Sequence, residues 1–228
     1  MKTLSLTAFN RPSYLQKALQ SLSRNDLAGY DRLYIGLEPG NAQVLEICKN
    51  INFIDTEIIQ NKSVLGVRDN PYSLLKTVFD RGSKLNVYLE DDVLISPDAL
   101  SLANWYDHLP ARDEYLCLSL FRKLEPLGVA LVEESSKFDA LGFVLSREQW
   151  CKYFEKYWYA QSNGWDHSIR GMIKELGVKT LIPGQSRSFH IGREGGVHYR
   201  PQLHDRVHLK IDWNKSERIS EFSLEKSQ

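Results

Sequence analysis

Short apolar runs alternate with helix-like stripes along the first half of the chain. The runs are typical of buried strands, and the stripes repeat apolar residues every three or four positions, as helices do when they pack on a sheet. This pattern predicts strands over residues 3–9, 33–37, 56–60 and 86–89, and helices over 12–22, over 70–82 and directly after 96–98. Such alternation indicates an α/β protein, so we predict a Rossmann-like mixed central sheet flanked by helices.

The second half of the chain is organised differently. Its apolar runs predict strands over 115–121, 128–132, 140–145 and 179–182, with an aromatic-rich helix around 150–159 and another helix over 165–177. Residues 183–200 are rich in glycine, arginine and histidine and have little periodicity, which predicts a binding loop that closes as a lid. Beyond about residue 212 the sequence is polar, and we expect a loose tail there.

The composition indicates one globular domain without a global electrostatic partner. The chain has 228 residues, of which 42% are hydrophobic, and this is enough for one well-filled core. Lys+Arg and Asp+Glu are equal at 29 each, which disfavours nucleic acid as a partner. A local basic patch is still conceivable from Arg187, Arg193, Arg200, Arg206 and Lys210.

Nothing in the sequence predicts membrane insertion or secretion. No apolar run approaches the roughly 20 residues of a membrane span, and the first residues fit a strand better than a signal peptide. Cys48, Cys117 and Cys151 are odd in number and widely spaced, which is typical of reduced thiols. We therefore expect a cytoplasmic protein with no membrane span.

Three adjacent acids interrupt the apolar stretch NVYLEDDVLISPDAL at residues 86–100. Two unit charges about 4 Å apart repel by roughly 1 kcal/mol in water and about 4 kcal/mol at an effective dielectric of about 20, so Glu90, Asp91 and Asp92 require a neutralising partner. Ligands of open α/β sheets bind at the carboxyl ends of the strands, where these acids should emerge. Carboxylates there suit Mn²⁺ or Mg²⁺ shared with phosphate oxygens, and the alternative is a solvated acidic turn.

Basic residues stand near the ends of two other early elements. Arg11 follows the first predicted strand, and Arg68 precedes the predicted helix over 70–82. If these ends face one crevice, Arg11 and the amides of the following helix start could meet a diphosphate. We assign both arginines to donor binding, although Arg11 could equally be an ordinary surface residue.

Five segments resemble the GT-A glycosyltransferases of family 13, the N-acetylglucosaminyltransferases of N-glycan and O-mannose synthesis. They are FNRP, VYLEDDVLISPDAL, GFVLSREQW, GWDHSIR and IPGQSRSFHIGREG, in the family's order across most of residues 3–200. EDD in place of the commoner DxD is a specific mark of this family. The resemblance implies a single GT-A catalytic domain over 1–228, divided into a nucleotide-sugar-binding half (1–95), an acceptor half (96–211) with the lid at 183–200, and a polar tail (212–228).

The resemblance also implies roles for residues on the donor side. Asp92 would be the direct metal ligand, and Glu90 and Asp91 would reach the sugar and the ribose of the donor. Arg11 would lie near the diphosphate, and Glu38 would lie near the uracil and ribose. These roles imply a UDP-sugar as the donor, with UDP-GlcNAc or a close relative as the first choice.

On the acceptor side, the resemblance makes Asp166 the catalytic base and places Trp165 in the sugar or acceptor pocket. On sequence alone, Asp166 fits better as a first-turn helix acid, and Trp165 fits core packing. In the predicted lid, His190 could complete the metal coordination or be structural. Arg187 could contact the diphosphate or be solvated.

These expectations combine into one predicted function, with two alternatives. We predict a metal-dependent inverting glycosyltransferase, in which Asp166 removes a proton from the acceptor hydroxyl while Asp92 binds the metal that neutralises the leaving diphosphate. The acceptor would be a glycan, a glycolipid or another small molecule such as a modified base. The alternatives are a nucleotidyltransferase that acts on sugar phosphates, although no glycine-rich phosphate loop follows the first strand, and a glycan-binding module built on the aromatic residues 150–159.

Overall fold

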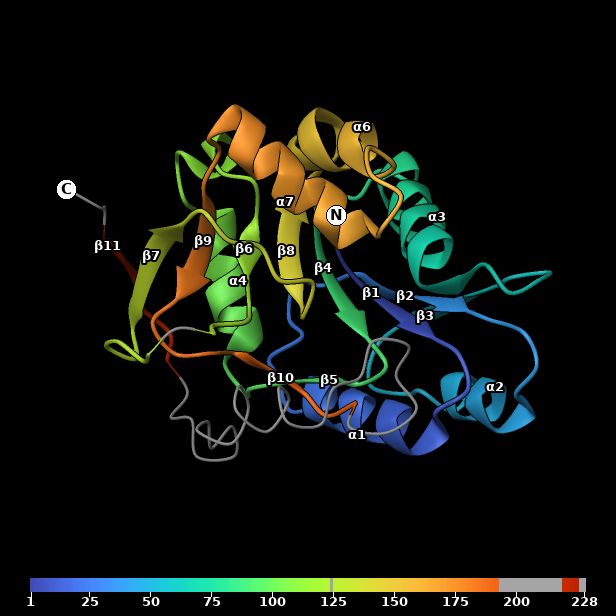
Figure 1. The fold of residues 1–228 in the computed structure, drawn as a ribbon. Helices are drawn as coiled ribbons and strands as arrows, with labels where there is room; N and C mark the ends of the chain where they lie inside the picture. Colours follow the sequence, from blue (N-terminus) through green and yellow to red (C-terminus); the bar gives the residue numbers. More distant parts are fainter. Residues whose placement is uncertain (124, 193–218, 226–228) are drawn as a thin grey trace.

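A mixed sheet runs through the middle of the molecule, and helices cover both of its faces (Figure 1). The computed structural model describes residues 1–123, 125–192 and 219–225. Within these ranges the strand order is β11-β7-β9-β6-β8-β4-β1-β2-β3, and β10 and β5 form a separate two-stranded sheet. The strands are β1 (Lys2–Ala8), β2 (Arg32–Leu37), β3 (Thr56–Gln60), β4 (Leu85–Glu90), β5 (Val93–Ile95), β6 (Leu118–Ser119), β7 (Leu131–Ser135), β8 (Phe143–Ser146), β9 (Thr180–Pro183), β10 (Ser188–His190) and β11 (Ser223–Glu225). The α-helices are α1 (Pro12–Ser23), α2 (Ala42–Lys49), α3 (Gly66–Asp80), α4 (Ala99–Asp107), α5 (Arg147–Gln149), α6 (Glu155–Tyr157) and α7 (Trp165–Leu176).

The strands of the first half form the parallel part of the sheet. β4, β1, β2 and β3 lie side by side, and Leu6 of β1 pairs with Ile35 of β2 and with Leu89 of β4. β1 and β4 are largely buried, and their buried polar side chains bond to one another: Asn86 accepts from Thr3 and donates to Ser5. The four strands predicted in this half are confirmed to within one residue at each end. Their carboxyl ends all meet at one edge of the sheet.

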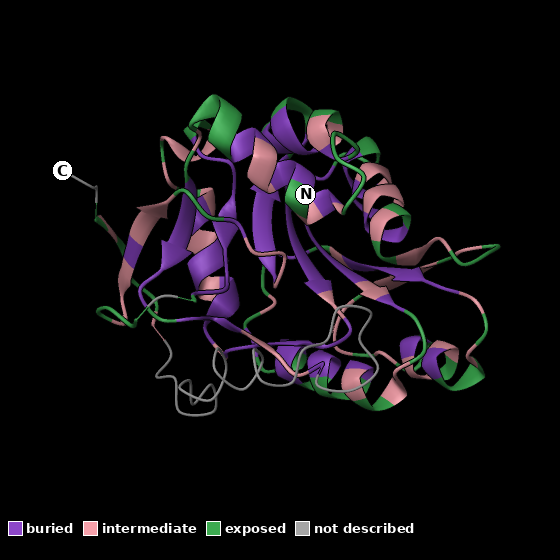
Figure 2. Ribbon diagram, in the orientation of Figure 1, coloured by how far each residue is buried: buried purple, intermediate pink, exposed green. Residues whose placement is uncertain are grey.

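Two apolar layers hold the helices to the two faces of the sheet (Figure 2). One layer packs α1, α2 and α4 against the sheet through residues such as Leu15, Val44 and Leu100. The other layer is aromatic and packs α3, α7 and the segment before α7 against β4 and β8. Because successive side chains of a strand point to opposite faces, each central strand contributes to both layers.

The second half departs from the sequence prediction in its details. The strand predicted over 115–121 is reduced to β6, and the strand predicted over 128–132 begins later, as β7. The aromatic-rich segment is helical as predicted, but its middle, Trp150–Phe154, is a π-helix between α5 and α6. The helix over 165–177 is confirmed as α7, and Gly177 ends it in the left-handed conformation that favours glycine, with φ 66°.

The expectation of a loose tail is wrong for the part of the tail that the structure describes. β11 pairs in parallel with β7 and adds a strand to the edge of the sheet. Phe222, directly before β11, is only 9% exposed, and its ring lies 6.2 Å from that of Trp105. Burial of this aromatic side chain outweighs the polar composition of its neighbours.

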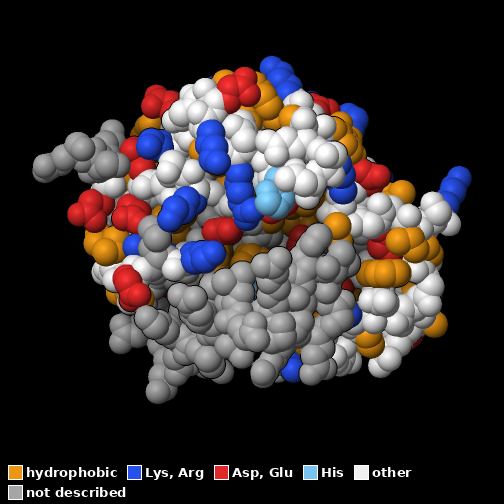
Figure 3. All heavy atoms as spheres, viewed as in Figure 1, with side chains coloured by type: hydrophobic (Ala, Val, Ile, Leu, Met, Phe, Trp, Pro, Cys, Tyr) orange, Lys and Arg blue, Asp and Glu red, His pale blue; other side chains and the backbone are white. Residues whose placement is uncertain are grey.

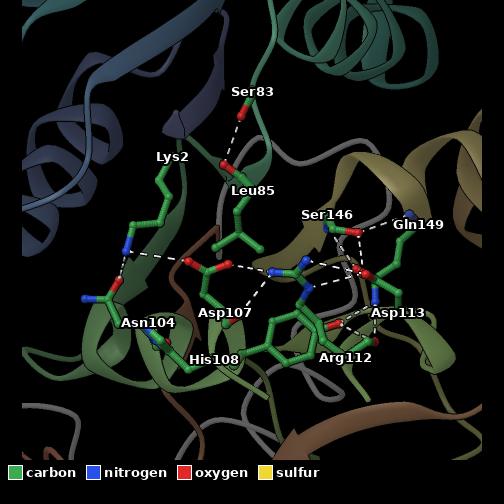
Figure 4. Close-up of polar contacts among 11 residues, drawn as sticks. Lys2, Ser83, Leu85, Asn104, Asp107, His108, Arg112, Asp113, Ser146 and Gln149 are labelled. Carbon is green, nitrogen blue, oxygen red and sulfur yellow. Dashed lines mark hydrogen bonds and ion pairs between the residues drawn. The ribbon is translucent and has the colours of Figure 1, made fainter. Parts of the chain in front are cut away.

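A polar network braces the sheet at its amino edge, opposite the acids (Figure 4). Arg112 lies between two carboxylates, with Nη1 2.5 Å from Asp107 Oδ1 and Nε 3.1 Å from Asp113 Oδ1. Ser146 at the end of β8 donates to Asp113 Oδ1 at 2.7 Å, and Lys2 Nζ lies 3.8 Å from Asp107 Oδ2. These contacts tie α4 and β8 to the start of β1.

Every helix within the described ranges is too short or too polar to cross a lipid bilayer. The three cysteines are free: Cys48 and Cys117 are buried, and Cys151 is exposed.

Candidate active site

The three adjacent acids lie at a turn on the carboxyl edge of the sheet. β4 ends at Glu90, residues Asp91 and Asp92 make the turn, and β5 continues from Val93. Because β4 and β5, on either side of the turn, are buried, the turn itself lies inside the protein. Asp91 and Asp92 are only 4% and 3% exposed. The Tyr88 hydroxyl group donates to Glu90 Oε1 at 3.3 Å.

Arg11 supplies part of the positive charge that the acids require. It follows β1, the neighbour of β4, and its Nη2 donates to Asp91 Oδ1. Its Nη1 lies 2.6 Å from Asp92 Oδ2, and the backbone N–H of Phe9 donates to Asp91 Oδ2 at 3.3 Å. One guanidinium group therefore bridges both aspartates of the turn.

His190 reaches the same aspartate from a distant part of the sequence. β10 pairs antiparallel with β5, so His190 stands opposite Val93. His190 Nε2 lies 3.0 Å from Asp92 Oδ2, and the N–H of Ile191 donates to Asp92 O at 2.8 Å. The next residue is Gly192, where an added Cβ would lie 2.7 Å from His190 Nε2 and 3.0 Å from Asp92 Cγ, so the close approach of this strand requires glycine.

Burial and mutual repulsion perturb the acids in different ways. Burial raises the pKa of Glu90 to about 8, and the charges of Asp92 and Asp91 add to this effect. Burial also raises the pKa of Asp91 to about 6, against the pull of Arg11. Burial acts on Asp92 in the same sense, but the His190 and Arg11 contacts outweigh it, so the pKa of Asp92 is lowered. Further positive charge is needed for all three acids to be ionised at neutral pH.

The donor atoms around Asp92 fit a hard divalent cation. Asp92 Oδ1 is buried and has no hydrogen-bond partner among the described residues, whereas Oδ2 contacts Arg11 and His190. A buried oxygen without a donor costs about 1–3 kcal/mol, which a cation would offset. No group of three or more His, Cys, Asp and Glu that could hold a metal occurs within the described ranges. Asp92 and His190 would therefore be joined by phosphate oxygens and water, an arrangement common for Mg²⁺.

Asp166 lies in the first turn of α7, where the sequence predicts it. The helix begins after Gly164, whose φ of 140° only glycine adopts readily, and Asp166 Oδ2 lies 3.0 Å from Arg170 Nη1. Trp165 is only 5% exposed and stacks on Trp158, with ring centroids 4.2 Å apart. The Trp165 ring therefore belongs to the core beneath the site and does not line an open pocket.

Glu38 lies at the end of β2 and holds the start of α3. It is 4% exposed, and Oε1 accepts the N–H groups of Leu65 at 3.0 Å and Gly66 at 2.7 Å. Asn61 also donates to Glu38 Oε2 at 3.1 Å. These contacts explain why α3 begins at Gly66, four residues before the predicted helix.

Arg68 is directed to the loop before α7 and makes no described contact with the acids. Its Nη2 donates to Gln161 O at 2.5 Å, and its guanidinium group lies 4.9 Å from the centre of the Tyr159 ring. Tyr159 donates in turn to Asp69 Oδ1 at 2.9 Å. Arg68 thus joins the first turn of α3 to the segment that precedes Asp166.

Arg187 lies in a buried ion pair at the other end of the β5–β10 pair from Asp92. Its side chain is 1% exposed, and its Nε lies 2.9 Å from Asp98 Oδ2. Nη1 donates to Gln185 O and Nη2 donates to Val129 O, each at 2.8 Å. Because all three nitrogens are engaged within the core, this placement contradicts the predicted contact with the diphosphate.

The aromatic residues 150–159 do not form the surface that a glycan-binding module would need. Trp150 is 1% exposed and Trp158 is fully buried, and only Tyr159 of this segment is substantially exposed among the large apolar residues. The predicted lid is described as far as Gly192, and it contributes His190 to the acids. Arg193 and His198, which we expected in this lid, lie outside the described residues.

The structure thus brings Arg11, Glu90, Asp91, Asp92 and His190 to one place, and positions Asp166 separately at the start of α7. The sequence prediction missed Arg170, which holds the Asp166 carboxylate. Its spacing of four residues from Asp166 is the usual spacing of helical ion pairs and could have revealed it.

The fold is similar to that of known glycosyltransferases. S. aureus TarS 1-349 in complex with UDP-GlcNAc matches with a TM-score of 0.62 and 13% identity, over 90% of this chain and 64% of that one. The mannosyltransferase PcManGT from Pyrobaculum calidifontis, in complex with GDP-Man and Mn²⁺, matches with a TM-score of 0.57 and 12% identity, over 80% of this chain and 54% of that one. The chain has a GT-A glycosyltransferase fold.

This GT-A chain spans less than two thirds of the length of both structures. No family model and no curated protein matches its sequence. The similarity therefore concerns the fold, and the chemistry of the site has to be argued from its own residues.

Proposed function

We propose that the chain is a metal-dependent inverting glycosyltransferase that acts on a UDP-sugar. The observation that carries this proposal is the convergence of Arg11 and His190 on the Asp91–Asp92 turn at the carboxyl edge of a GT-A sheet. TarS in complex with UDP-GlcNAc and PcManGT in complex with GDP-Man and Mn²⁺ support the donor class. The resemblance to family 13 supports inversion, UDP-GlcNAc or a close relative as donor, and a hydroxyl group of a glycan, a glycolipid or another small molecule as acceptor.

The acids and Arg11 would bind the donor. Asp92 and His190 would hold Mn²⁺ or Mg²⁺, which when bound supplies positive charge opposite the leaving diphosphate. Arg11 already lies against the same carboxylates, and its planar guanidinium group suits phosphate oxygens. Glu90 and Asp91 would accept hydrogen bonds from hydroxyl groups of the sugar and the ribose.

Asp166 would remove the proton from the acceptor hydroxyl group as its oxygen attacks the anomeric carbon. Its carboxylate is partly exposed at the start of α7, and Arg170 holds Oδ2 at 3.0 Å. This contact leaves Oδ1 to face an acceptor. General base assistance of this kind is typically worth about 10²–10⁴ in rate.

Two supporting roles complete the proposal. Glu38 would place the loop that lies near the uracil and ribose, since it fixes residues 61–66 from the end of β2. Arg68 and Trp165 would support the segment that carries Asp166, through Gln161 and the stack on Trp158. The three free cysteines are in keeping with the predicted cytoplasmic location.

Thermal unfolding with a panel of nucleotide sugars, with and without Mn²⁺, tests the proposal. A ligand at about 100 times its Kd adds about 2.7 kcal/mol of stability, which raises the Tm of a chain of this size by roughly 5–10 °C. We expect this rise for a UDP-sugar with Mn²⁺. Asp92→Asn should abolish the part of the Tm rise that depends on Mn²⁺. Asp80→Asn, which removes an exposed ion pair with Lys76, should preserve that part.

The base is tested separately from the donor site. Asp166→Asn should keep the donor-induced rise in Tm and lower transfer by about 100-fold or more, because it removes only the proton acceptor. Normal turnover by Asp166→Asn would exclude this base and leave the donor site standing. If no UDP-sugar stabilises the chain in the presence of Mn²⁺, the proposed function itself is excluded.

A further inference from the structure

A small hollow lies on the proposed acceptor half, outside the acidic cluster. It is bounded by the ends of β6, β7 and β9 and by the segment before β8. Its lining residues are Ser119, Phe121, Lys123, Ser135, Lys137, Asp139 and Ile182. Figure 3 shows Lys and Arg side chains gathered on this face of the molecule, over α7 and the neighbouring strands.

The arginines and the lysines of this face differ in how they are paired. Arg122 Nη1 lies 2.7 Å from Glu133 Oε1, and Arg170 Nη2 lies 3.1 Å from Asp139 Oδ1. Lys123 and Lys137 are exposed, and neither has an ion-pair partner in the part of the chain that the structure describes. Among the lining residues, the two lysines outnumber the single acid, Asp139, which shares Arg170 with Asp166.

The hollow is linked directly to the proposed base. Arg170 lies between Asp139 and Asp166, at 3.1 Å and 3.0 Å, and its Nε donates to Phe138 O at 2.9 Å. A single side chain therefore separates the carboxylate of the base from the wall of the hollow. An acceptor whose hydroxyl group reaches Asp166 can extend a neighbouring group toward Lys123 and Lys137.

Charge on the acceptor would otherwise be disfavoured at this site. The acids at 90–92, the proposed base and the diphosphate of the donor are all negative, so an anionic acceptor would be repelled without nearby cations. Lys123 and Lys137, in the hollow that Arg170 connects to Asp166, would supply such cations. A neutral acceptor gains nothing from them.

We propose that the acceptor carries an anionic group, a phosphate or a carboxylate, that binds between Lys123 and Lys137. This inference rests on the proposed function, because it names the chemical class of the molecule that receives the sugar. The lysines select the acceptor by its charge, and Asp166 acts on its hydroxyl group.

Lysine-resolved NMR of the full chain tests the proposal. Reductive methylation with isotope-labelled methyl groups keeps the charge of each lysine and makes weak binding visible. The probes are a hexose phosphate, a hexuronate and the neutral hexose, each added with UDP and Mn²⁺ present. We expect the two anionic probes to shift the signals of Lys123 and Lys137 and to bind about tenfold tighter than the neutral hexose, as two exposed ion pairs allow.

Charge-matched variants identify the site. Lys123→Gln/Lys137→Gln should lose about tenfold in affinity for the anionic probes, whereas Lys49→Gln/Lys156→Gln, with the same loss of charge at exposed positions on α2 and α6, should keep it. Thermal unfolding should be unchanged in both, since all four lysines are exposed. A larger shift with the hexose phosphate identifies phosphate as the group, and a larger shift with the hexuronate identifies carboxylate.

The proposal is overturned by any of three results: equal binding of the three probes, full affinity in the Lys123→Gln/Lys137→Gln variant, or no shift of either signal by any probe. If the proposed function is wrong, UDP and Mn²⁺ will not raise the Tm of the wild-type chain. This result is independent of the NMR shifts of Lys123 and Lys137, so the two proposals can fail separately.

Discussion

Replacement of Arg187 by methionine should destabilise the protein without abolishing donor binding. Arg187 and Asp98 are 1% and 0% exposed, and Asp98 Oδ1 also accepts from Ser96 Oγ at 2.6 Å. Arg187→Met leaves the Asp98 charge buried without its cation. Breaking a buried pair in this way costs about 3–5 kcal/mol. At about 2–4 °C per kcal/mol for a chain of this size, the Tm should fall by roughly 6–20 °C.

The assay compares unfolding with donor binding in the same preparations. Urea and thermal unfolding give the loss of stability, and titration with UDP and Mn²⁺ at a temperature where the variant is folded gives the affinity. Arg187→Met/Asp98→Leu should recover most of the loss, because removing both charges of a buried pair is often close to neutral. Arg32→Met breaks contacts to Asp55 and Glu57 at the surface and serves as the matched control, with a cost of about 1 kcal/mol or less.

One result would refute this reasoning. If Arg187→Met unfolds like the wild type but no longer binds UDP, Arg187 contacts the diphosphate, which was one of the two roles considered from the sequence, and the ion pair with Asp98 contributes little.

Two further predictions concern the acidic cluster. Gly192→Ala should weaken the Mn²⁺-dependent binding of UDP, because the new Cβ would crowd His190 Nε2 at 2.7 Å and Asp92 Cγ at 3.0 Å, and unchanged binding would show that β10 can move away. Glu90→Gln should stabilise the metal-free protein in alkaline but not in acidic solution. Folding raises the pKa of Glu90 from 4.5 to about 8. The wild-type carboxyl group therefore stabilises the folded protein fully below pH 4.5, and this contribution is lost as the pH rises through about 8. Equal Tm values for wild type and Glu90→Gln at all pH values, measured with a chelator present, would contradict the raised pKa.

The parallel core of the fold could be predicted because its signals are local. β1, β2 and β4 are short, largely buried segments and β3 is a short partly buried one, so each carries its strand signal within a few residues, and their ends were predicted to within one residue. The same logic placed the acids at the end of β4, since a parallel strand presents its carboxyl end at the ligand-binding edge. Arg11 was predicted for the same reason, as the residue that leaves the neighbouring strand.

The rest depends on contacts between distant segments. β10 brings His190 to Asp92 through three pairs with β5, and neither short segment carries a signal for that pairing. Arg187 looks like a loop arginine in the sequence, and only the packing of β10 and α4 encloses it with Asp98. β11 is polar apart from one leucine, and its place in the sheet depends on the burial of Phe222 beside it.

The position of α3 has a consequence for the order of events at the site. The N–H of Gly66, its first residue, donates to Glu38 after β2, where we propose that the nucleotide binds, and Arg68 on the same turn donates to Gln161 in the loop that leads to Asp166. One helical turn would therefore connect the proposed binding sites of the donor and the acceptor. Binding of a nucleoside next to β2 would orient Asp166 before an acceptor binds. We therefore expect an ordered mechanism in which the donor binds first.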